Sequence, residues 1–412
     1  MQQLLFADDP QFWFETLRVF GHASYGGADF GEVVATSARI TPGDYDSWHD
    51  AWLATAARVA GEAERAEAAG HPVSARDGYL RASTYYRTAE FFLHDNPDDP
   101  RISYAYQRGV ACFQAAVCRL DGAAEPVEIP YDGTVLHGYF YRAAAAAAGE
   151  RRPTVLMHSG FDGSAEEMHF FGALAGVERG YHVLSFDGPG QPSAIHRHKL
   201  TFRPDWEHVV TPALEYLLAT EPTADPDRIA VLGVSLGGML APRAAAFEPR
   251  LAALVALDGV YDASSVATVA LGIDRETLYR RAHADRDDEL DQVLERVRAA
   301  SPTMRWAFGH GQFAMGAPDP RRFLAAYLDY HVRDGVAERI SCPTLVCAAE
   351  DDLFFAAQDG AAAEPDQLFE HLTCAKTMLR FTEEEGADAH CQAGAQRLAM
   401  ARIYDWLDDT LR

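Results

Sequence analysis

Residues 231–238 read Val-Leu-Gly-Val-Ser-Leu-Gly-Gly and contain the spacing Gly233-x-Ser235-x-Gly237. An apolar run from Ile229 to Leu232 precedes Gly233, and the helix-forming stretch Met239 to Phe247 follows the octapeptide. A strand, a sharp turn and a helix in this order hold a serine in a strained backbone conformation, with its hydroxyl exposed above a sheet. Glycines on both sides of the serine are required because side chains there would collide with the neighbouring strand or helix. We therefore interpret Ser235 as a catalytic nucleophile.

A nucleophilic serine needs a base to accept its proton and a carboxylate to orient that base. His390 follows the last predicted strand across a loop, from which its side chain can reach the serine, so we predict that it is the base. The preceding strand, which begins at Pro343, runs into Glu350-Asp351-Asp352. Carboxylates at the end of a parallel strand lie at the sheet edge where ligands bind. The acid is expected there, while Asp258 and Asp262, after an earlier strand, form a less favoured second position.

The third requirement of acyl transfer is a pair of backbone N–H groups that stabilise the developing oxyanion. One is expected from Leu236, directly after the serine, and the other from the loop after the strand Thr154–His158. By its position in that loop, Phe161 is predicted to supply the second amide. The next residue, Asp162, is unexpected because an anion there opposes the charge that the site must stabilise. It either caps the following helix or acts as a working acid or base.

Composition narrows the class of protein. The chain has 412 residues, 48% hydrophobic content and a formal net charge of −25. Such a charge disfavours binding to nucleic acid or to anionic membranes, and we find no apolar run long enough to span a bilayer. We expect a cytoplasmic protein with reduced cysteines. The sequence has no metal-ligand, P-loop or dinucleotide motif, so we predict neither a metal nor a cofactor.

The pattern of elements predicts one catalytic core with helical additions. Residues 1–122 have helical periodicity and are predicted to form an N-terminal helical cap region. Residues 123–261 and 338–412 alternate short apolar strands with helices, which predicts a mostly parallel sheet with helices on both faces. Residues 262–337 interrupt this rhythm above the predicted active-site edge and are interpreted as a helical lid. The predicted parallel strands are Thr154–His158, Tyr181–Phe186, Ile229–Val234, Leu251–Leu257, Thr344–Ala348 and Thr377–Phe381, after a hairpin with a turn at Asp132-Gly133.

These features resemble the α/β-hydrolase family over residues 125–412. A closer resemblance, over nearly the whole chain, is to 2,6-dihydroxypseudooxynicotine hydrolase and to the fungal hydrolases that shorten naphthopyrone polyketides. It depends on Arg81-Ala-Ser-Thr-Tyr-Tyr-Arg-Thr-Ala-Glu-Phe-Phe-Leu, Asp187-Gly-Pro-Gly-Gln, Trp306-x-x-x-His310-Gly and Glu385-Gly-x-x-x-His390-Cys-Gln-x-Gly394.

The resemblance implies an α/β-hydrolase fold and a triad of Ser235, Asp352 and His390. Hydrolases of this fold usually have a glycine three residues before the acid, where this chain has Ala349; on this count Asp352 is preferred to Asp351. The resemblance also implies an acidic residue on the oxyanion loop that takes part in C–C cleavage, and Asp162 is similar to it in position. Within the lid, we predict that Trp306, His310 and Phe313 bind the substrate.

We therefore expect a cofactor-independent serine hydrolase that cleaves a C–C bond next to a ketone in an aromatic or polyketide-like small molecule. A carbon leaving group must be protonated as it departs, and Asp162 or His390 could supply that proton. A carboxylesterase or thioesterase is the first alternative, and an acyltransferase or cyclase of secondary metabolism is another. The sequence leaves the oligomeric state open, with a homodimer as one expectation.

Overall fold

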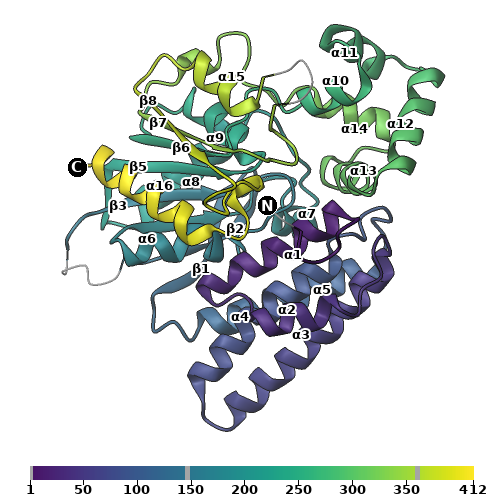
Figure 1. The fold of residues 1–412 in the computed structure, drawn as a ribbon. Helices are drawn as coiled ribbons and strands as arrows, with labels where there is room; N and C mark the ends of the chain where they lie inside the picture. The colour runs from purple at the N-terminus through teal and green to yellow at the C-terminus, as the bar shows by residue number, and fades with distance from the viewer. Residues whose placement is uncertain (1–2, 144–148, 358–361) are drawn as a thin grey trace.

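The computed structural model describes residues 3–143, 149–357 and 362–412. Within these residues, strands of one sheet follow the order β1-β2-β4-β3-β5-β6-β7-β8 (Figure 1). The β1/β2 and β2/β4 pairs are antiparallel, and the other pairs are parallel. The strands are β1 Ala124–Tyr131, β2 Thr134–Tyr141, β3 Arg152–His158, β4 His182–Phe186, β5 Ala224–Val234, β6 Ala253–Leu257, β7 Thr344–Ala349 and β8 Lys376–Phe381.

Side-chain alternation along the parallel strands divides the core between the two faces of the sheet. In β3, Val155 and Met157 belong to a cluster that includes Tyr404 of α16, whereas Leu156 belongs to a second cluster on the other face, with α8 and α9. Because successive strand residues point to opposite faces, fully apolar strands require cover on both sides. The covering helices are α6 Leu174–Glu178, α7 Pro192–His198, α8 Glu207–Thr220, α9 Gly237–Ala245, α15 Glu364–His371 and α16 Gln396–Thr410.

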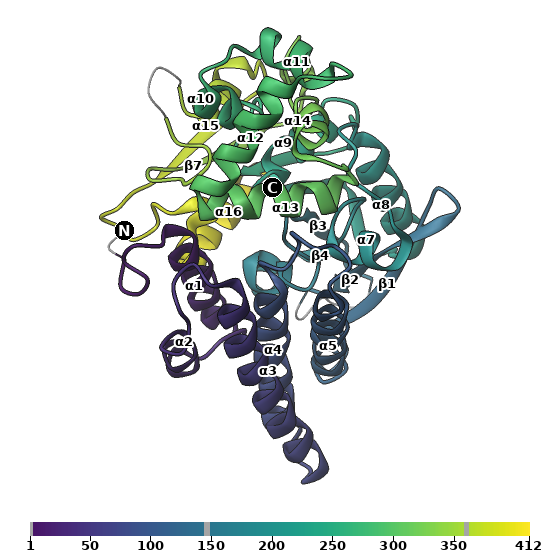
Figure 2. The ribbon, with the colours of Figure 1, turned by 90° about the vertical axis from the view of Figure 1, so that its right-hand side faces the viewer.

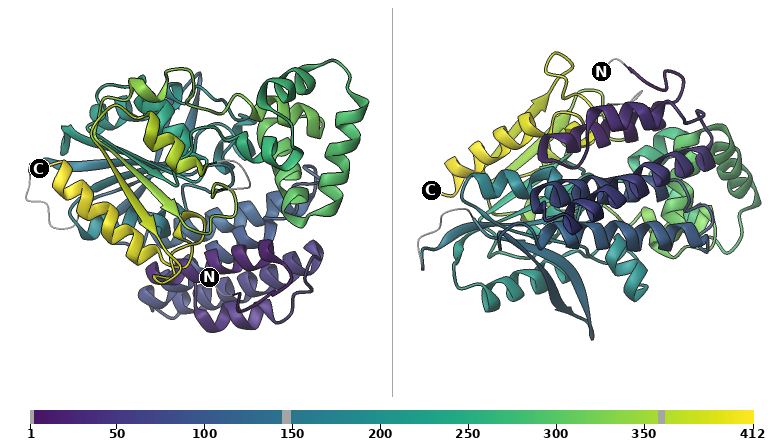
Figure 3. Two further views of the ribbon diagram at one scale, coloured as in Figure 1. Left: turned by 45° about the horizontal axis from the view of Figure 1, so that its top comes forward. Right: turned by 90° about the horizontal axis from the view of Figure 1, so that it is seen from below.

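The N-terminal residues form helices that lie side by side along one side of the core (Figure 3). They are α1 Pro10–His22, α2 Phe30–Ser37, α3 Tyr45–Ala68, α4 Pro72–Glu90 and α5 Pro100–Val117. Three of their large aromatic residues, Trp48, Trp52 and Tyr85, are fully buried and share a cluster with one face of the sheet. No described helix is long and apolar enough to cross a membrane.

Five further helices occupy the connection between β6 and β7 and stand beside the N-terminal helices (Figures 1 and 2). They are α10 Ser265–Leu271, α11 Arg275–His283, α12 Asp288–Ala300, α13 Pro302–Met315 and α14 Pro320–Tyr327. They have an apolar cluster of their own. They also contact the N-terminal region. The Tyr45 hydroxyl of α3 donates to the Pro302 carbonyl at 2.9 Å, and Arg298 pairs with Asp95, in the loop between α4 and α5, at 3.0 Å.

The predicted elements agree with this arrangement. The mostly parallel sheet with helices on both faces is confirmed, and each predicted parallel strand is found with shifts of at most a few residues at its ends. The largest shift is at β5, which begins at Ala224 and not at Ile229, because Arg152 of β3 pairs with Ala224 through an irregularity in the register. The sheet therefore brings the loops after β3, β5, β6, β7 and β8 to one edge.

Candidate active site

The turn after β5 presents Ser235 in the strained conformation that the sequence predicts. Ser235 has a φ of +63°, in the left-handed region that residues other than glycine rarely adopt. A Cβ atom at Gly233 would lie 2.0 Å from the Gly237 oxygen, and one at Gly238 would lie 1.7 Å from the Asp258 carbonyl oxygen. These approaches leave no room for side chains, so the backbone around the serine is fixed from both sides.

The serine, a histidine and a carboxylate form a hydrogen-bonded series at the edge of the sheet. The Ser235 Oγ atom is 2.8 Å from His390 Nε2, and His390 Nδ1 is 2.8 Å from Asp352 Oδ2. The backbone N–H groups of Phe354 and Phe355 donate to Asp352 Oδ1 at 2.7 and 3.0 Å. Asp352 and His390 are buried, whereas Ser235 is partly exposed. The residues come from three loops at one sheet edge, as the sequence predicts.

A second carboxyl group shares the histidine. Asp258, which follows β6, has its Oδ2 atom 3.1 Å from His390 Nδ1 and accepts from the Cys391 N–H and from Gln392 Nε2. Complete burial, and then the charge of Asp352, raise the pKa of Asp258. Burial opposes ionisation of Asp352 as well, but the charge and hydrogen bond of His390 outweigh it and lower the pKa of that group. The negative charge beside His390 therefore resides on Asp352.

The other acids considered from the sequence lie elsewhere. Asp351 is exposed, one residue before the buried Asp352. Asp262 accepts from Ser264 and pairs with Arg275 at 2.8 Å, so it belongs to the start of the inserted helices. Burial tends to lower the pKa of His390, but the charge of Asp352 outweighs it and raises that pKa well above its ordinary value. This stabilises the imidazolium that forms when a base accepts a proton.

The loop after β3 lies directly against the serine turn. A Cβ atom at Gly160 would be 2.5 Å from the Leu236 nitrogen, so the two backbones touch. Among the described residues, neither the Phe161 N–H nor the Leu236 N–H donates a hydrogen bond. Two unpaired donors beside a serine hydroxyl can stabilise an oxyanion. The cap of the next helix turn comes from Ser164, whose Oγ accepts from the Glu167 N–H at 3.3 Å, and not from Asp162.

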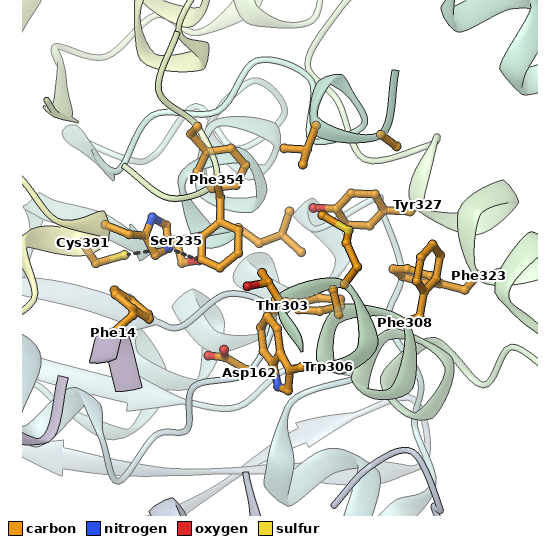
Figure 4. A pocket seen from close by; sticks show the side chains of 18 of the residues that line it. Phe14, Asp162, Ser235, Thr303, Trp306, Phe308, Phe323, Tyr327, Phe354 and Cys391 are labelled. Carbon is orange, nitrogen blue, oxygen red and sulfur yellow. Dashed lines mark hydrogen bonds between the residues drawn. The ribbon is translucent and has the colours of Figure 1, made fainter. Parts of the chain in front are cut away.

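Ser235 opens into an apolar cavity that extends into the inserted helices (Figure 4). The space outside protein atoms, part of which is open to solvent, measures about 1250 Å³. Phe14, Phe354 and Trp306 line it near the serine, and aliphatic and aromatic side chains of α10, α12, α13 and α14 line the part within the inserted helices. Because most of the lining side chains are apolar, the cavity suits an apolar ligand.

The three predicted lid contacts separate into two groups. Trp306 lines the main cavity and stacks on Phe91 at a ring distance of 5.1 Å. His310 and Phe313 instead line a smaller, more polar cavity between α4, α5, α7 and α13. The reason is that His310 Nε2 donates a hydrogen bond to the Phe161 carbonyl oxygen at 2.8 Å. This bond holds the His310 ring against the side of the oxyanion loop that faces away from the main cavity.

One wall of the main cavity carries a cluster of charged side chains from the N-terminal helices and the oxyanion loop. Arg18 of α1 pairs with Asp162 at 3.1 Å and binds Glu167 through Nε, at 2.7 Å, and through Nη2, at 2.5 Å. Arg87 of α4 lies 3.7 Å from Asp162 and 3.5 Å from Glu167. Burial opposes ionisation of Asp162, but the charges of Arg18 and Arg87 outweigh it and lower its pKa. Asp162 is therefore an ionised carboxylate.

A further acid, Glu15 of α1, completes the cluster. Its Oε2 atom lies 3.6 Å from Arg18 and 3.9 Å from Arg87, and its side chain is 2% exposed. Burial raises the pKa of Glu15 to about 8, against the attraction of Arg18. At neutral pH a protonated Glu15 leaves two arginines facing two carboxylates, Asp162 and Glu167, so the cluster is electrically balanced next to the oxyanion loop.

Asp258, His390 and Cys391 offer ligand atoms within 4.8 Å of one another and could in principle hold a metal ion. His390 Nε2, however, already faces Ser235, and Nδ1 faces the two carboxyl groups. Cys391 Sγ is 3.3 Å from His390 Nε2, and burial raises the pKa of its thiol to about 12. A neutral thiol is a poor metal ligand, so this group fits acid–base chemistry better.

Several residues of the site were absent from the sequence prediction. Phe14, Glu15 and Arg18 come from α1, more than 200 residues before the serine. A detectable signal was present, because Glu15 and Arg18 interrupt a strongly apolar helix one turn apart. Phe354 packs against the His390 ring at 5.0 Å and follows the acid, where hydrophobic residues are too common to stand out.

Comparison with known proteins gives matches over most of the chain. A model described as "Alpha/beta hydrolase family" matches residues 154–392. A model described as "Esterase FrsA-like" matches residues 8–267, which include the N-terminal helices.

Individual relatives cover the chain from end to end. "Hydrolase LUC6" of Fusarium sp is 36% identical, over 97% of this chain and 96% of the relative. "20-hydroxy-prefusarin hydrolase FUS2" of Gibberella moniliformis is 34% identical, over 98% and 97%. Among solved structures, the 2,6-dihydroxy-pseudo-oxynicotine hydrolase has a TM-score of 0.71 at 24% identity and 95% coverage of both chains.

The proton on Glu15 predicts a specific pH dependence of stability. Its folded pKa, about 8, lies above its ordinary value of 4.5, so stability from this group is lost progressively as pH rises from 4.5 to about 8. Glu15→Gln keeps the neutral shape at every pH. We expect the free energy of unfolding of this variant, relative to wild type, to increase by at least about 1.4 kcal/mol between pH 5 and 9, the equivalent of one pKa unit. Urea unfolding measures it.

Glu289→Gln is the matched control, since that side chain is 84% exposed. It should follow the wild-type pH dependence. If Glu15→Gln also follows the wild type, Glu15 is ionised at neutral pH and the charge balance described above is wrong.

Proposed function

Because the chain belongs to the alpha/beta hydrolase family and is a hydrolytic enzyme, we propose that it is a serine hydrolase with Ser235, His390 and Asp352 as its catalytic triad. The family assignment also confirms the predicted fold class. The observation that carries the proposal is the pair of 2.8 Å contacts that link Ser235 Oγ to His390 and His390 to Asp352. These groups supply nucleophile, base and orienting acid, so the proposed reaction needs no cofactor.

In the proposed reaction, Ser235 Oγ forms a bond to a carbonyl carbon as His390 Nε2 accepts its proton. The carbonyl π electrons move to the oxygen, which the amides of Phe161 and Leu236 stabilise. When the tetrahedral intermediate collapses, the bond to the leaving group breaks and an acyl-enzyme remains. Water, deprotonated by His390, then releases the acid and regenerates Ser235.

The leaving group takes its proton from His390. The histidine holds the serine proton when the intermediate collapses, so the same Nε2 atom can pass that proton to the departing group. Asp162, the other candidate from the sequence, has a lowered pKa and no proton to give in the resting state. For a carbon leaving group this transfer yields a neutral ketone or arene, because the bonding electron pair captures the proton from Nε2.

We further propose that the bond broken is a C–C bond next to a ketone, in a large, mainly apolar, polyketide-like molecule. The mainly aliphatic and aromatic lining of the cavity supports a substrate of this kind. A relative of 34% identity is named for 20-hydroxy-prefusarin, and the resemblance of the sequence motifs implies ketone cleavage. Exclusion of water by the inserted helices, acting as a lid, would protect the carbanionic leaving group until His390 protonates it.

Ester hydrolysis is the second candidate. The match of residues 8–267 to the esterase-like model favours it, and the same three residues perform it without change. An oxygen or sulfur leaving group departs more readily without being protonated. Ester hydrolysis therefore requires less control of proton transfer and of water access in the cavity.

Ser235→Ala is expected to reduce turnover by about 10⁴-fold or more, because the nucleophile is lost and only binding and the oxyanion amides remain. Ser103→Ala, an exposed position on α5, is the control and should retain wild-type rates. Labelling by a fluorophosphonate probe, followed by peptide mass spectrometry, should modify Ser235 in the wild type. Retention of more than a tenth of the activity in Ser235→Ala would refute the assignment.

The two carboxyl groups beside His390 are expected to respond differently to the same substitution. Asp352→Asn removes the negative charge that orients and stabilises the imidazolium, and should reduce kcat by about 10⁴-fold. Asp258→Asn replaces a neutral carboxyl by a neutral amide and should cost less than about tenfold, well short of the loss typical of a triad acid. A larger loss in Asp258→Asn than in Asp352→Asn would transfer the role of triad acid to Asp258.

The two candidate reactions are separated by matched substrates that deliver the same acyl group. We expect an aryl β-diketone with a long alkyl chain to be hydrolysed with kcat/KM of about 10⁴ M⁻¹s⁻¹ or higher, the lower end of typical enzymes. The p-nitrophenyl ester of the same acid measures the intrinsic acylation rate. An enzyme that turns over only the ester, with no cleavage of the diketone, would be an esterase.

A further inference from the structure

Asp162 is a charged residue of the main cavity that the proposed hydrolytic steps do not use. It lines the same cavity as Ser235, and Figure 4 shows its carboxylate on the wall between Phe14 and Trp306. Its side chain is 16% exposed, whereas that of the neighbouring Glu167 is 2% exposed. Asp162 is thus the more accessible of the two carboxylates that line this cavity.

The two oxygens of Asp162 have different environments. Arg18 and Arg87 both approach Oδ1, at 3.1 and 3.7 Å. Among the described residues, none donates a hydrogen bond to Oδ2. Both oxygens of Glu167, by contrast, are occupied by Arg18, and His22 lies 3.2 Å from Oε1. An anionic acceptor with a free oxygen in a mostly apolar cavity favours a ligand that brings a hydrogen-bond donor when it displaces solvent.

We infer that Asp162 is a specificity-determining residue whose Oδ2 atom accepts a hydrogen bond from a hydroxyl or N–H group of the substrate. The substrate class is therefore a ketone that also carries an enol, phenol, alcohol or amide N–H near the carbonyl. This inference rests on the proposed function, because it concerns the same cavity, and it assigns Asp162 to recognition of the substrate and not to proton transfer.

The surroundings of Asp162 favour a neutral donor over an anion. Arg18 Nε and Nη2 already bind carboxylates, and Arg87 faces Asp162, Glu167 and Glu15, so a substrate carboxylate finds no free cation. The negative charge of Asp162 would instead repel a substrate carboxylate. A substrate with a methyl ether in place of the hydroxyl group would have no hydrogen to donate to Oδ2. It would also keep solvent water away from that oxygen. Sites built to bond a substrate hydroxyl discriminate strongly against analogues that lack it.

Thr303 is the alternative partner for a polar substrate group, because it supplies a neutral hydroxyl to an otherwise apolar part of the same cavity. A hydroxyl group bonded there would not depend on Asp162. The charged acceptor is favoured because hydrogen bonds to ionised groups are about twice as strong as those between neutral groups.

The test measures binding in the inactive Ser235→Ala protein, so that it is independent of which bond the enzyme cleaves. The probes are 3-hydroxyphenyl hexyl ketone and its 3-methoxy and 3-carboxy analogues, titrated by calorimetry. We expect the hydroxy ketone to bind about tenfold or more tightly than either analogue, the discrimination typical of a hydrogen bond to a charged group. Equal affinities for the three ketones would overturn the inference and leave the proposed hydrolysis untouched.

Second substitutions in the same protein identify the partner. Asp162→Asn should reduce the preference for hydroxy over methoxy to less than about threefold and remove the penalty on the carboxy analogue, whereas Thr303→Val should retain both. Should Asp162→Asn not fold, Asp162→Ser takes its place. Loss of the preference in Thr303→Val, or its persistence without the carboxylate at 162, would contradict the inference. Tightest binding of the carboxy ketone would make Arg18 the recognition residue.

Discussion

The site depends on one steric constraint, the close approach of three backbones around Ser235. A Cβ atom at Gly238 would lie 1.7 Å from the Asp258 carbonyl oxygen, and one at Gly160 would lie 2.5 Å from the Leu236 nitrogen. The turn after β5 is therefore held between the loops after β6 and β3. A strained residue such as Ser235 persists only when its surroundings fix it in this way. The same contacts bring Asp258 to the histidine and the oxyanion loop to the serine.

The sequence predicts the parts of the site that follow a strand, because a parallel sheet brings all such loops to one edge. Ser235 and His390 could be placed by that rule, whereas choosing Asp352 over Asp351 also needed the spacing from Ala349 that the family resemblance implies. Arg18 could not, since its position depends on how α1 packs against the oxyanion loop, which no local pattern encodes. The predicted lid contacts show a related limit. Helical spacing groups Trp306, His310 and Phe313, but the bond from His310 to the Phe161 carbonyl turns part of that set to another cavity.

The N-terminal helices have an electrostatic role at the site as well as a packing role. An isolated Asp162 would oppose an oxyanion on the neighbouring amides, and an isolated Arg18 would be costly to bury. Together with Arg87 and Glu167 they form a balanced set, with Glu15 holding the proton that prevents an excess of negative charge. Charge balance explains why acids on the oxyanion loop, Asp162 and Glu167, occur with buried arginines on α1 and α4. The buried acids without the arginines, or the arginines without the acids, would destabilise the folded chain.

Charge balance also governs the two carboxyl groups beside His390, which lie closer together. Two anions cannot both face one Nδ1 atom in a buried site, so one of them must keep a proton. Asp352 lies in the loop after β7 and accepts hydrogen bonds from two backbone N–H groups, which stabilise its charge. Asp258 is fully buried and ties Cys391 and Gln392 to the loop after β6. The charged carboxylate can then stabilise the imidazolium, while the neutral one fixes the turn that carries it. A single negative charge beside His390 suffices for the base, and the second carboxyl group is retained because it holds the histidine loop in place.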